Sequence, residues 1–314
     1  MINIKEKMGT CGRFNLIVRK AQTNEIVRET GWFDNLVLDQ GLDAMAEGGW
    51  FASCKVGTGN SIPVATQTQL DAYKALSINV QTQTQGVSSV APYYKWSRKT
   101  FRFKAGDFNN TNLSEVAIGL DNTRNGAGIW NRALIKDGLG NPTVLTVLAD
   151  EVLDVLCEIR VYQSQADING HFNLLDKNGN IIQEIAAVIR PSKITTAKTT
   201  IGVGLAAMNA YSFNLLRAYN GDIGGITSTP SGSEVFTGNP SQQGLGYSPY
   251  VLGSHELKFT AYYLLGDGNS APTKSLFIQG VISDYQVSLT PAITKNATQT
   301  LNLSYSLSWG RYNP

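Results

Sequence analysis

The sequence predicts an all-β protein, built as an antiparallel β-sandwich or a jelly-roll-like architecture with only short helices. Apolar and polar residues alternate along several segments, which is the pattern of strands with one buried face. Gly accounts for 31 of the 314 residues, and Asn, Thr, Ser and Gln are frequent, as in strands joined by turns. Helical periodicity is confined to Asp39–Glu47 and Ala65–Leu76, so helices do not organise the fold.

A set of segments is predicted to form strands, because each is rich in β-branched or aromatic residues or alternates with period two. In chain order they are Arg13–Arg19, Trp50–Val56, Tyr93–Lys104, Ser114–Leu120, Gly128–Ile135, Leu153–Tyr162, Ile181–Ile189, Glu256–Leu265, Ser275–Val281 and Leu301–Trp309. The alternation is clearest in the last of them. Leu153–Tyr162 is apolar on both faces, which predicts a strand between two layers.

Turn residues separate these strands. Asp137–Pro142 and Asp176–Asn180 have the Asp, Asn and Gly content of hairpin turns that need a positive φ. The second of them resembles the start of a calcium loop, but Gly179 is misplaced and Ala187 stands where a bidentate Glu is required, so a hairpin is favoured. Tyr219–Tyr250 is predicted to be a long connection that orders against a neighbour.

The chain is long enough for two modules. We expect a β-rich attachment module at residues 1–162, followed at 163–314 by a second β-rich module or a continuation of the same sandwich. The polar stretch Tyr162–Ala166 marks the expected boundary.

Composition excludes several partners. The 26 basic and 24 acidic residues give a net charge of +2, which offers no electrostatic basis for binding nucleic acid or an anionic membrane. No apolar run long enough for a signal peptide or a membrane span is found, so we expect synthesis in a cytoplasm. Cys11, Cys54 and Cys157 are far apart, which predicts buried thiols and neither a disulfide framework nor a zinc site.

No catalytic arrangement is evident, so we expect a protein that is not an enzyme and has no cofactor and no metal. Val56–Ser61 contains the glycines of a nucleotide loop but lacks its Gly-Lys-Ser/Thr ending, and a plain turn is favoured. His171 and His255 are the only histidines, and neither belongs to a nucleophile or metal motif. Glu115 is interpreted as a lone acid at the start of a strand.

Two groups of segments resemble structural proteins of tailed bacteriophage virions. The first comprises Asn35–Val37, Gly41–Asp43, Cys54–Gly59 and Pro63–Leu70. The second comprises Phe101–Phe103, Leu113–Gly119, Trp130–Ile135 and Leu153–Tyr162. In proteins of this kind, an N-terminal β-rich module attaches a collar, tail-tip or fibre-like component to the virion.

The resemblance implies a non-enzymatic virion protein, made in the host cytoplasm, that forms a ring or trimer and joins tail or neck components. Its partners would be copies of itself and other virion proteins. Two alternatives are an adhesin or carbohydrate-binding module that recognises a host surface glycan, and a capsid decoration protein. A third alternative is a polysaccharide-degrading enzyme, for which the sequence indicates no particular acidic residue as catalytic. Aromatic side chains are the candidate interface or ligand contacts, namely Tyr93, Tyr94, Trp96, Tyr247 and Tyr250.

Overall fold

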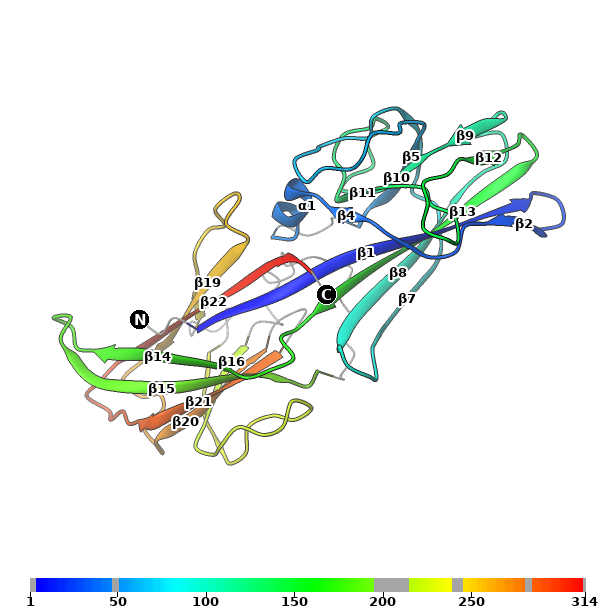
Figure 1. Ribbon diagram of the computed structural model, residues 1–314. Helices are drawn as coiled ribbons and strands as arrows, with labels where there is room; N and C mark the ends of the chain where they lie inside the picture. Colours follow the sequence, from blue (N-terminus) through cyan, green and yellow to red (C-terminus); the bar gives the residue numbers. More distant parts are fainter. Residues whose placement is uncertain (1–3, 47–50, 195–214, 239–244, 280–283, 313–314) are drawn as a thin grey trace.

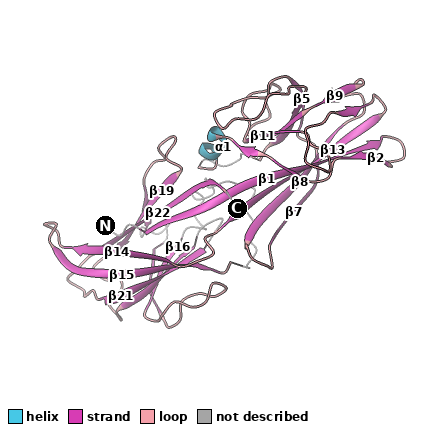
Figure 2. Cartoon of the chain, in the orientation of Figure 1, coloured by secondary structure: helices cyan, strands magenta, loops and turns pink. Residues whose placement is uncertain are grey.

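The computed structural model describes residues 4–46, 51–194, 215–238, 245–279 and 284–312. Within these ranges the only α-helix is α1 (Asp39–Ala44), and strands make up nearly all the remaining regular structure, as Figure 2 shows. The predicted all-β, sandwich-like fold is therefore confirmed. The molecule is elongated, with one long sheet running through it (Figure 1). No helix in the described ranges has the length and apolar character needed to cross a membrane.

The long sheet contains nine strands. Its strands follow the order β18 (Leu245–Tyr247), β19 (Glu256–Tyr263), β22 (Leu301–Arg311), β1 (Ile4–Lys20), β13 (Glu151–Tyr162), β8 (Tyr94–Phe103) and β7 (Val80–Val87), with β2 (Ile26–Glu29) and β3 (Phe33–Asp34) also paired to β1.

The other strands form three smaller sheets. The five-stranded sheet has the order β4 (Leu36–Val37), β11 (Asn131–Leu134), β10 (Glu115–Gly119), β5 (Ser53–Gly57) and β6 (Tyr73–Ser77). The six-stranded sheet has the order β14 (Ile168–Leu175), β15 (Ile181–Ser192), β21 (Asp284–Ile293), β20 (Thr273–Gln279), β16 (Leu215–Tyr219) and β17 (Glu234–Gly238). The two-stranded sheet pairs β12 (Leu145–Val147) with β9 (Thr111–Leu113).

The long sheet joins the two halves of the chain. β1, from the N-terminal half, runs parallel to β22, from the C-terminal half, with Ile4 opposite Tyr305 and Thr10 opposite Arg311. The larger of two hydrophobic clusters in the described residues contains residues of both halves. The expected boundary at Tyr162–Ala166 coincides with the connection from β13 to β14, but a cut there would divide a shared sheet.

Strand β13 shows why the two faces of this sheet differ. Its alternate residues Leu153, Val155, Cys157, Ile159 and Val161 are buried in the core, as the period-two pattern predicts. On its opposite face lie the carboxylates of Asp154 and Glu158. Arginines of β1 and β8 pair with both carboxylates from either side, so a charged ladder covers the face where we expected a second layer.

The other predicted strands are confirmed, with ends shifted by up to three residues except in β1, which begins nine residues before the predicted Arg13. Trp50, Gly280 and Val281 lie outside the described residues. Both predicted hairpin turns are also confirmed: Gly140 and Gly179 have φ values of 86° and 87°, and the preceding Asp137 and Asp176 carboxylates accept backbone N–H bonds within each turn.

Two predictions about local structure are wrong. Ala65–Leu76 is not helical, since its first part is a loop and its end belongs to β6. The predicted connection Tyr219–Tyr250 contains strands β17 and β18. Its first part is held by the buried amide of Gln286, which bonds to the backbone of Gly224 and Gly225. The predicted helix Asp39–Glu47 is confirmed as far as Ala44, and Glu47 lies outside the described residues.

Candidate functional site

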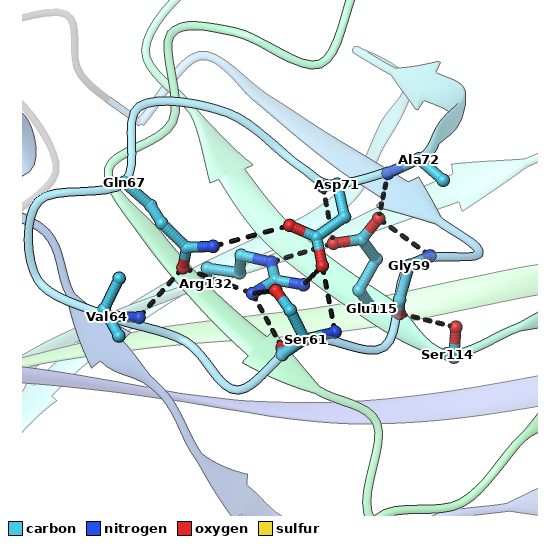
Figure 3. A network of polar contacts seen from close by, with 9 residues as sticks. All are labelled: Gly59, Ser61, Val64, Gln67, Asp71, Ala72, Ser114, Glu115 and Arg132. Atoms are coloured by element: carbon cyan, nitrogen blue, oxygen red, sulfur yellow. Dashed lines mark hydrogen bonds and ion pairs between the residues drawn. The ribbon is translucent and has the colours of Figure 1, made fainter.

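A buried polar network lies on the outer face of the five-stranded sheet, beneath the loop Thr58–Ala72 that joins β5 to β6. We call this segment the β5–β6 loop. Glu115 opens β10 directly opposite Gly57 of β5, and Arg132 belongs to the adjacent strand β11. Figure 3 shows their side chains converging beneath the loop.

Glu115 binds the loop through its backbone. Oε1 accepts hydrogen bonds from the N–H groups of Gly59 at 3.0 Å and Ala72 at 2.8 Å. Oε2 accepts one from the N–H of Asp71 at 3.1 Å and one from Nε of Arg132 at 2.8 Å. The side chain is fully buried, and each carboxylate oxygen has two donors. One acid therefore fixes both ends of the loop.

Arg132 is also fully buried and binds the middle of the loop. One terminal nitrogen donates to the carbonyl oxygen of Ser61 at 2.9 Å and to Oε1 of Gln67 at 3.2 Å. The other donates to Oδ2 of Asp71 at 2.7 Å. Arginine suits this position because its planar guanidinium offers five donors in a fixed arrangement.

Asp71 completes the network from the loop side. Burial by itself raises the pKa of its carboxyl group, but hydrogen bonds from Ser61 and the charge of Arg132 outweigh that effect and leave the pKa below its ordinary value. Asp71 is therefore ionised at neutral pH and offsets the positive charge of Arg132.

The glycines of the Val56–Ser61 motif are explained by this network. A Cβ atom on Gly57 or Gly59 would lie 2.4 Å or 2.6 Å from Oε1 of Glu115, closer than any real contact allows. The backbone amide of Gly59, which a nucleotide loop would direct at a phosphate, instead donates to an internal carboxylate. The motif shapes a turn around Glu115.

The same network explains why Ala65–Leu76 does not form a helix. The N–H groups of Asp71 and Ala72 bond to Glu115, so they do not bond to carbonyl groups four residues earlier. The network leaves the tip of the loop facing solvent, where the side chains of Ile62 and Val64 are 79% and 52% exposed. The site therefore presents an apolar tip on a loop fixed by buried charges.

The neighbouring loop, Leu120–Trp130, is held in a similar way. Lys55 of β5 is fully buried, and its ammonium group donates to Oδ1 of Asp121 at 3.2 Å and to the carbonyl oxygen of Ala127. Two surface loops of this sheet are thus each fixed by a buried cation.

Two of the predicted aromatic contacts share one face of the long sheet. Tyr94 and Trp96 are alternate residues of β8, and both are half-buried. The guanidinium of Arg160 lies 4.5 Å from the ring centre of Tyr94, and that of Arg98 lies 5.2 Å from that of Trp96. Tyr93 precedes the strand and is half-buried.

Trp32, which the sequence analysis did not select, belongs to the same surface. The guanidinium groups of Arg13 and Arg98 lie 4.4 Å and 4.7 Å from its ring centre. These arginines occupy positions that a sugar would need for stacking on the ring. We call Trp32, Tyr94, Trp96 and their arginines the aromatic face.

The other two predicted contacts lie elsewhere. Tyr250 stacks on Trp309 at 5.8 Å, and its hydroxyl donates to Oδ1 of Asp43 at 2.5 Å. Burial first, and then the bond to Asp43, raise the pKa of Tyr250. His255, one of the two histidines, lies 3.5 Å from the same Asp43 oxygen. Tyr247 belongs to β18, and its side chain lies outside the described residues.

Several expectations about single residues can now be settled. Glu115 is not a lone acid, because it is paired with Arg132. Cys54 and Cys157 are buried as predicted, Cys11 is half-buried, and all three are free thiols. His171 is exposed on β14. In the part of the chain that the structure describes, no three His, Cys, Asp or Glu side chains gather as metal ligands.

Sequence reasoning missed the partners of Glu115. Arg132 stands among apolar residues of a predicted strand, and a charged residue in such a run signals a buried ion pair. Asp71 gave no comparable signal.

Comparison of the chain with protein-family models, with curated proteins and with solved structures finds no match.

Proposed function

We propose that this chain is a non-enzymatic structural protein of a tailed bacteriophage virion, which assembles as a closed homo-oligomer, a ring or trimer, and joins tail or neck components. One observation carries the proposal. The segments that resemble such proteins pack together as the five-stranded sheet, its β5–β6 loop and the strands β8 and β13 of the facing sheet. The segments that carry the resemblance therefore belong to one packed unit of the N-terminal half.

The chemistry of the β5–β6 loop supports a binding role. All four bonds to the Glu115 carboxylate come from the loop and Arg132, so its charge serves to position the loop. Holding a loop rigid before it meets a partner lowers the conformational entropy lost on binding. Ile62 and Val64 at its tip are apolar side chains that a neighbouring virion protein would cover.

Imaging of assembled virions tests the proposal. An electron cryomicroscopy map that traces the chain in the tail or neck, or labelling there by an antibody against it, is the expected result. Particles that lack the protein would refute it. Location over the head, with a copy number that follows the capsid lattice, would favour the capsid decoration alternative.

A variant of the loop tip tests the contact directly. Ile62→Asp should reduce incorporation into particles, because it would place a charge where the apolar side chain is covered by the neighbouring virion protein. Val144→Asp is the matched control, since Val144 is exposed at 54% on a different loop. Equal incorporation of the two variants would exclude the loop tip as the contact.

The aromatic face favours the adhesin alternative as a second candidate, because Trp32, Tyr94 and Trp96 lie together and are only half-buried. That function predicts binding to a glycan array that is lost in Trp96→Ala and retained in Tyr250→Ala. Because arginines already stack on these rings, a wild-type chain that binds no glycan is the outcome that would exclude this alternative.

A further inference from the structure

Two cysteine thiols from different sheets meet in the core. Cys54 belongs to β5 of the five-stranded sheet, and Cys157 belongs to β13 of the nine-stranded sheet. Both side chains are fully buried, and both belong to the larger hydrophobic cluster. Their thiols are hydrogen-bonding neighbours. Sulfur atoms that are far apart in the sequence are therefore close together where the two sheets pack.

Strand alternation directs both side chains into the same interface. In β5, Cys54 and Val56 join the hydrophobic cluster, whereas Lys55 between them binds a surface loop on the outer face of its sheet. In β13, Cys157 precedes Glu158, whose carboxylate pairs with arginines on the outer face of the long sheet. Each cysteine thus occupies an inward position of its strand, toward the other sheet.

Neighbouring contacts hold the start of β5 beside Cys157. Lys99 of β8 lies directly opposite Cys157 in the sheet register, and its ammonium group donates to the carbonyl oxygen of Phe51 at 2.7 Å. The ring centre of Phe51 lies 6.0 Å from that of Phe101, which is also on β8. Phe51 precedes Cys54 by three residues. These contacts position the two strands without any contribution from the sulfur atoms.

The surroundings of Cys157 keep it protonated until an oxidant arrives. Burial first, and then the hydrogen bond and charge of Cys54, raise the pKa of Cys157 well above its ordinary value. The ammonium group of Lys99 acts in the opposite direction and favours the thiolate. Because the thiolate is the reactive form, the cation beside Cys157 identifies it as the sulfur that an oxidant meets first.

The third cysteine lies on the other side of the long sheet. Cys11 is half-buried and shares the outer face of β1 with Arg13, which pairs with Glu158. Burial raises the pKa of the Cys11 thiol to about 11. Since Cys157 faces the core, the sheet itself separates these two sulfur atoms. Cys11 therefore serves as an internal reference thiol.

We propose that Cys54 and Cys157 form a redox-controlled disulfide that bonds the five-stranded sheet to the nine-stranded sheet, with a small peroxide as the oxidant. Hydrogen peroxide oxidises the Cys157 thiol to a sulfenic acid and releases one water. The sulfur of Cys54 then attacks the Cys157 sulfur, so that the S–S bond forms and a second water leaves. The two thiols lose two protons and two electrons, which reduce the peroxide to two waters.

The bond would have a mechanical consequence for the fold. It closes a loop of roughly 100 residues, which restricts the unfolded chain and stabilises the folded one. It also fixes the sheet that carries the β5–β6 loop to the long sheet. In a reducing cytoplasm the pair stays as thiols, so the bond forms only where the protein meets an oxidant. This site lies outside the contacts on which the proposed function rests.

Mapping of the thiols in the full wild-type chain tests the proposal. The folded protein is treated with hydrogen peroxide, catalase stops the reaction, and the chain is denatured with iodoacetamide for mass spectrometry. The expected product has lost the mass of two hydrogen atoms, carries one alkylated cysteine, Cys11, and yields a peptide that links Cys54 to Cys157. Dithiothreitol should restore three alkylated cysteines. Three alkylated cysteines without reductant, a bridge to Cys11, or a sulfinic acid at Cys54 or Cys157 without the linked peptide would overturn the proposal.

Urea unfolding tests the effect of the bond. Oxidation should raise the urea midpoint of the wild type and of the matched control Cys11→Ala by about 1 M, and dithiothreitol should reverse the rise. Cys54→Ala should show no rise, because it lacks one of the two sulfur atoms. An equal rise in Cys54→Ala would assign the effect to another oxidation and overturn the stabilising role. The mapping of the wild type does not depend on the folding of either variant.

Discussion

Replacing Arg132 by methionine would remove the buried cation of the β5–β6 loop while keeping a side chain of similar length. The guanidinium makes five hydrogen bonds, to Glu115, Asp71, Gln67 and two atoms of Ser61. Without it, the fully buried Glu115 carboxylate loses the one cation with which it pairs among the described residues. Removing one partner of a buried ion pair costs about 3–5 kcal/mol.

The structure places the expected cost at the lower end of that range. Glu115 retains three backbone donors, from Gly59, Asp71 and Ala72, which continue to stabilise its charge. We therefore expect a loss of about 3 kcal/mol in the free energy of unfolding. The matched control is Arg98→Met, where Arg98 is 32% exposed and its partner Glu158 keeps Arg13 and Arg160. That loss should not exceed about 1 kcal/mol.

Two measurements check this prediction. Urea unfolding followed by tryptophan fluorescence gives the difference between the two variants, which should be about 2 kcal/mol. Limited proteolysis should cut the β5–β6 loop in Arg132→Met and leave it intact in Arg98→Met. Equal stability losses with an uncut loop would refute the assignment of Arg132 as the residue that fixes the loop. The Arg132→Met, Glu115→Gln double variant should lose less free energy of unfolding than the sum of the losses in the two single variants.

Three further predictions concern separate features. Gly59→Ala should destabilise the protein by about 1–3 kcal/mol, because its Cβ would lie 2.6 Å from Oε1 of Glu115. In the control Gly138→Ala, a Cβ meets nothing within 4 Å, so the free energy of unfolding should change by no more than about 0.5 kcal/mol. Equal thermal unfolding of the two variants would contradict the close approach at Gly59. Gln286→Leu should expose residues 220–233 to protease, because the amide bonds to Gly224 and Gly225 are lost, and resistance equal to wild type would argue against that role. For Glu158, burial raises the pKa, but bonds from three arginines outweigh it and hold the folded-state pKa below the ordinary value of 4.5. Its contribution to stability is therefore complete above that value and is lost as the pH falls toward the folded-state pKa. Between about pH 5 and pH 3, the free energy of unfolding should depend less on pH in Glu158→Gln than in the wild type. Identical slopes of the free energy against pH in the two proteins would contradict the prediction.

The strands themselves could be predicted from local pattern. Leu301–Trp309 alternates strictly, and the structure buries Leu301, Leu303, Tyr305, Leu307 and Trp309 on one face. The period of two fixes which face of a strand is apolar, wherever that strand lies in the sheet. The short strands β2, β3, β4, β9 and β12 were not predicted, because two to four residues carry too little periodicity. The longer strands β7, β14, β16 and β21 were also missed.

The helix predicted at Ala65–Leu76 shows where local pattern fails. Its Ala, Gln and Leu residues favour a helix, but Glu115 takes the backbone donors of Asp71 and Ala72, and Arg132 takes the carboxylate of Asp71. Both binding residues are more than 40 residues away in the chain. Propensity describes a segment alone and does not include such partners.

The sequence by itself determined that this chain forms an all-β protein, which residues several of its longer strands bury, and where two hairpins turn, because these properties depend on neighbours a few positions apart. Only the tertiary structure decided that Glu115, Arg132 and Asp71 meet beneath one loop, and that β1 and β22 join the two halves in one sheet. Those features depend on contacts between distant segments, and many pairings of such segments fit the same alternating pattern.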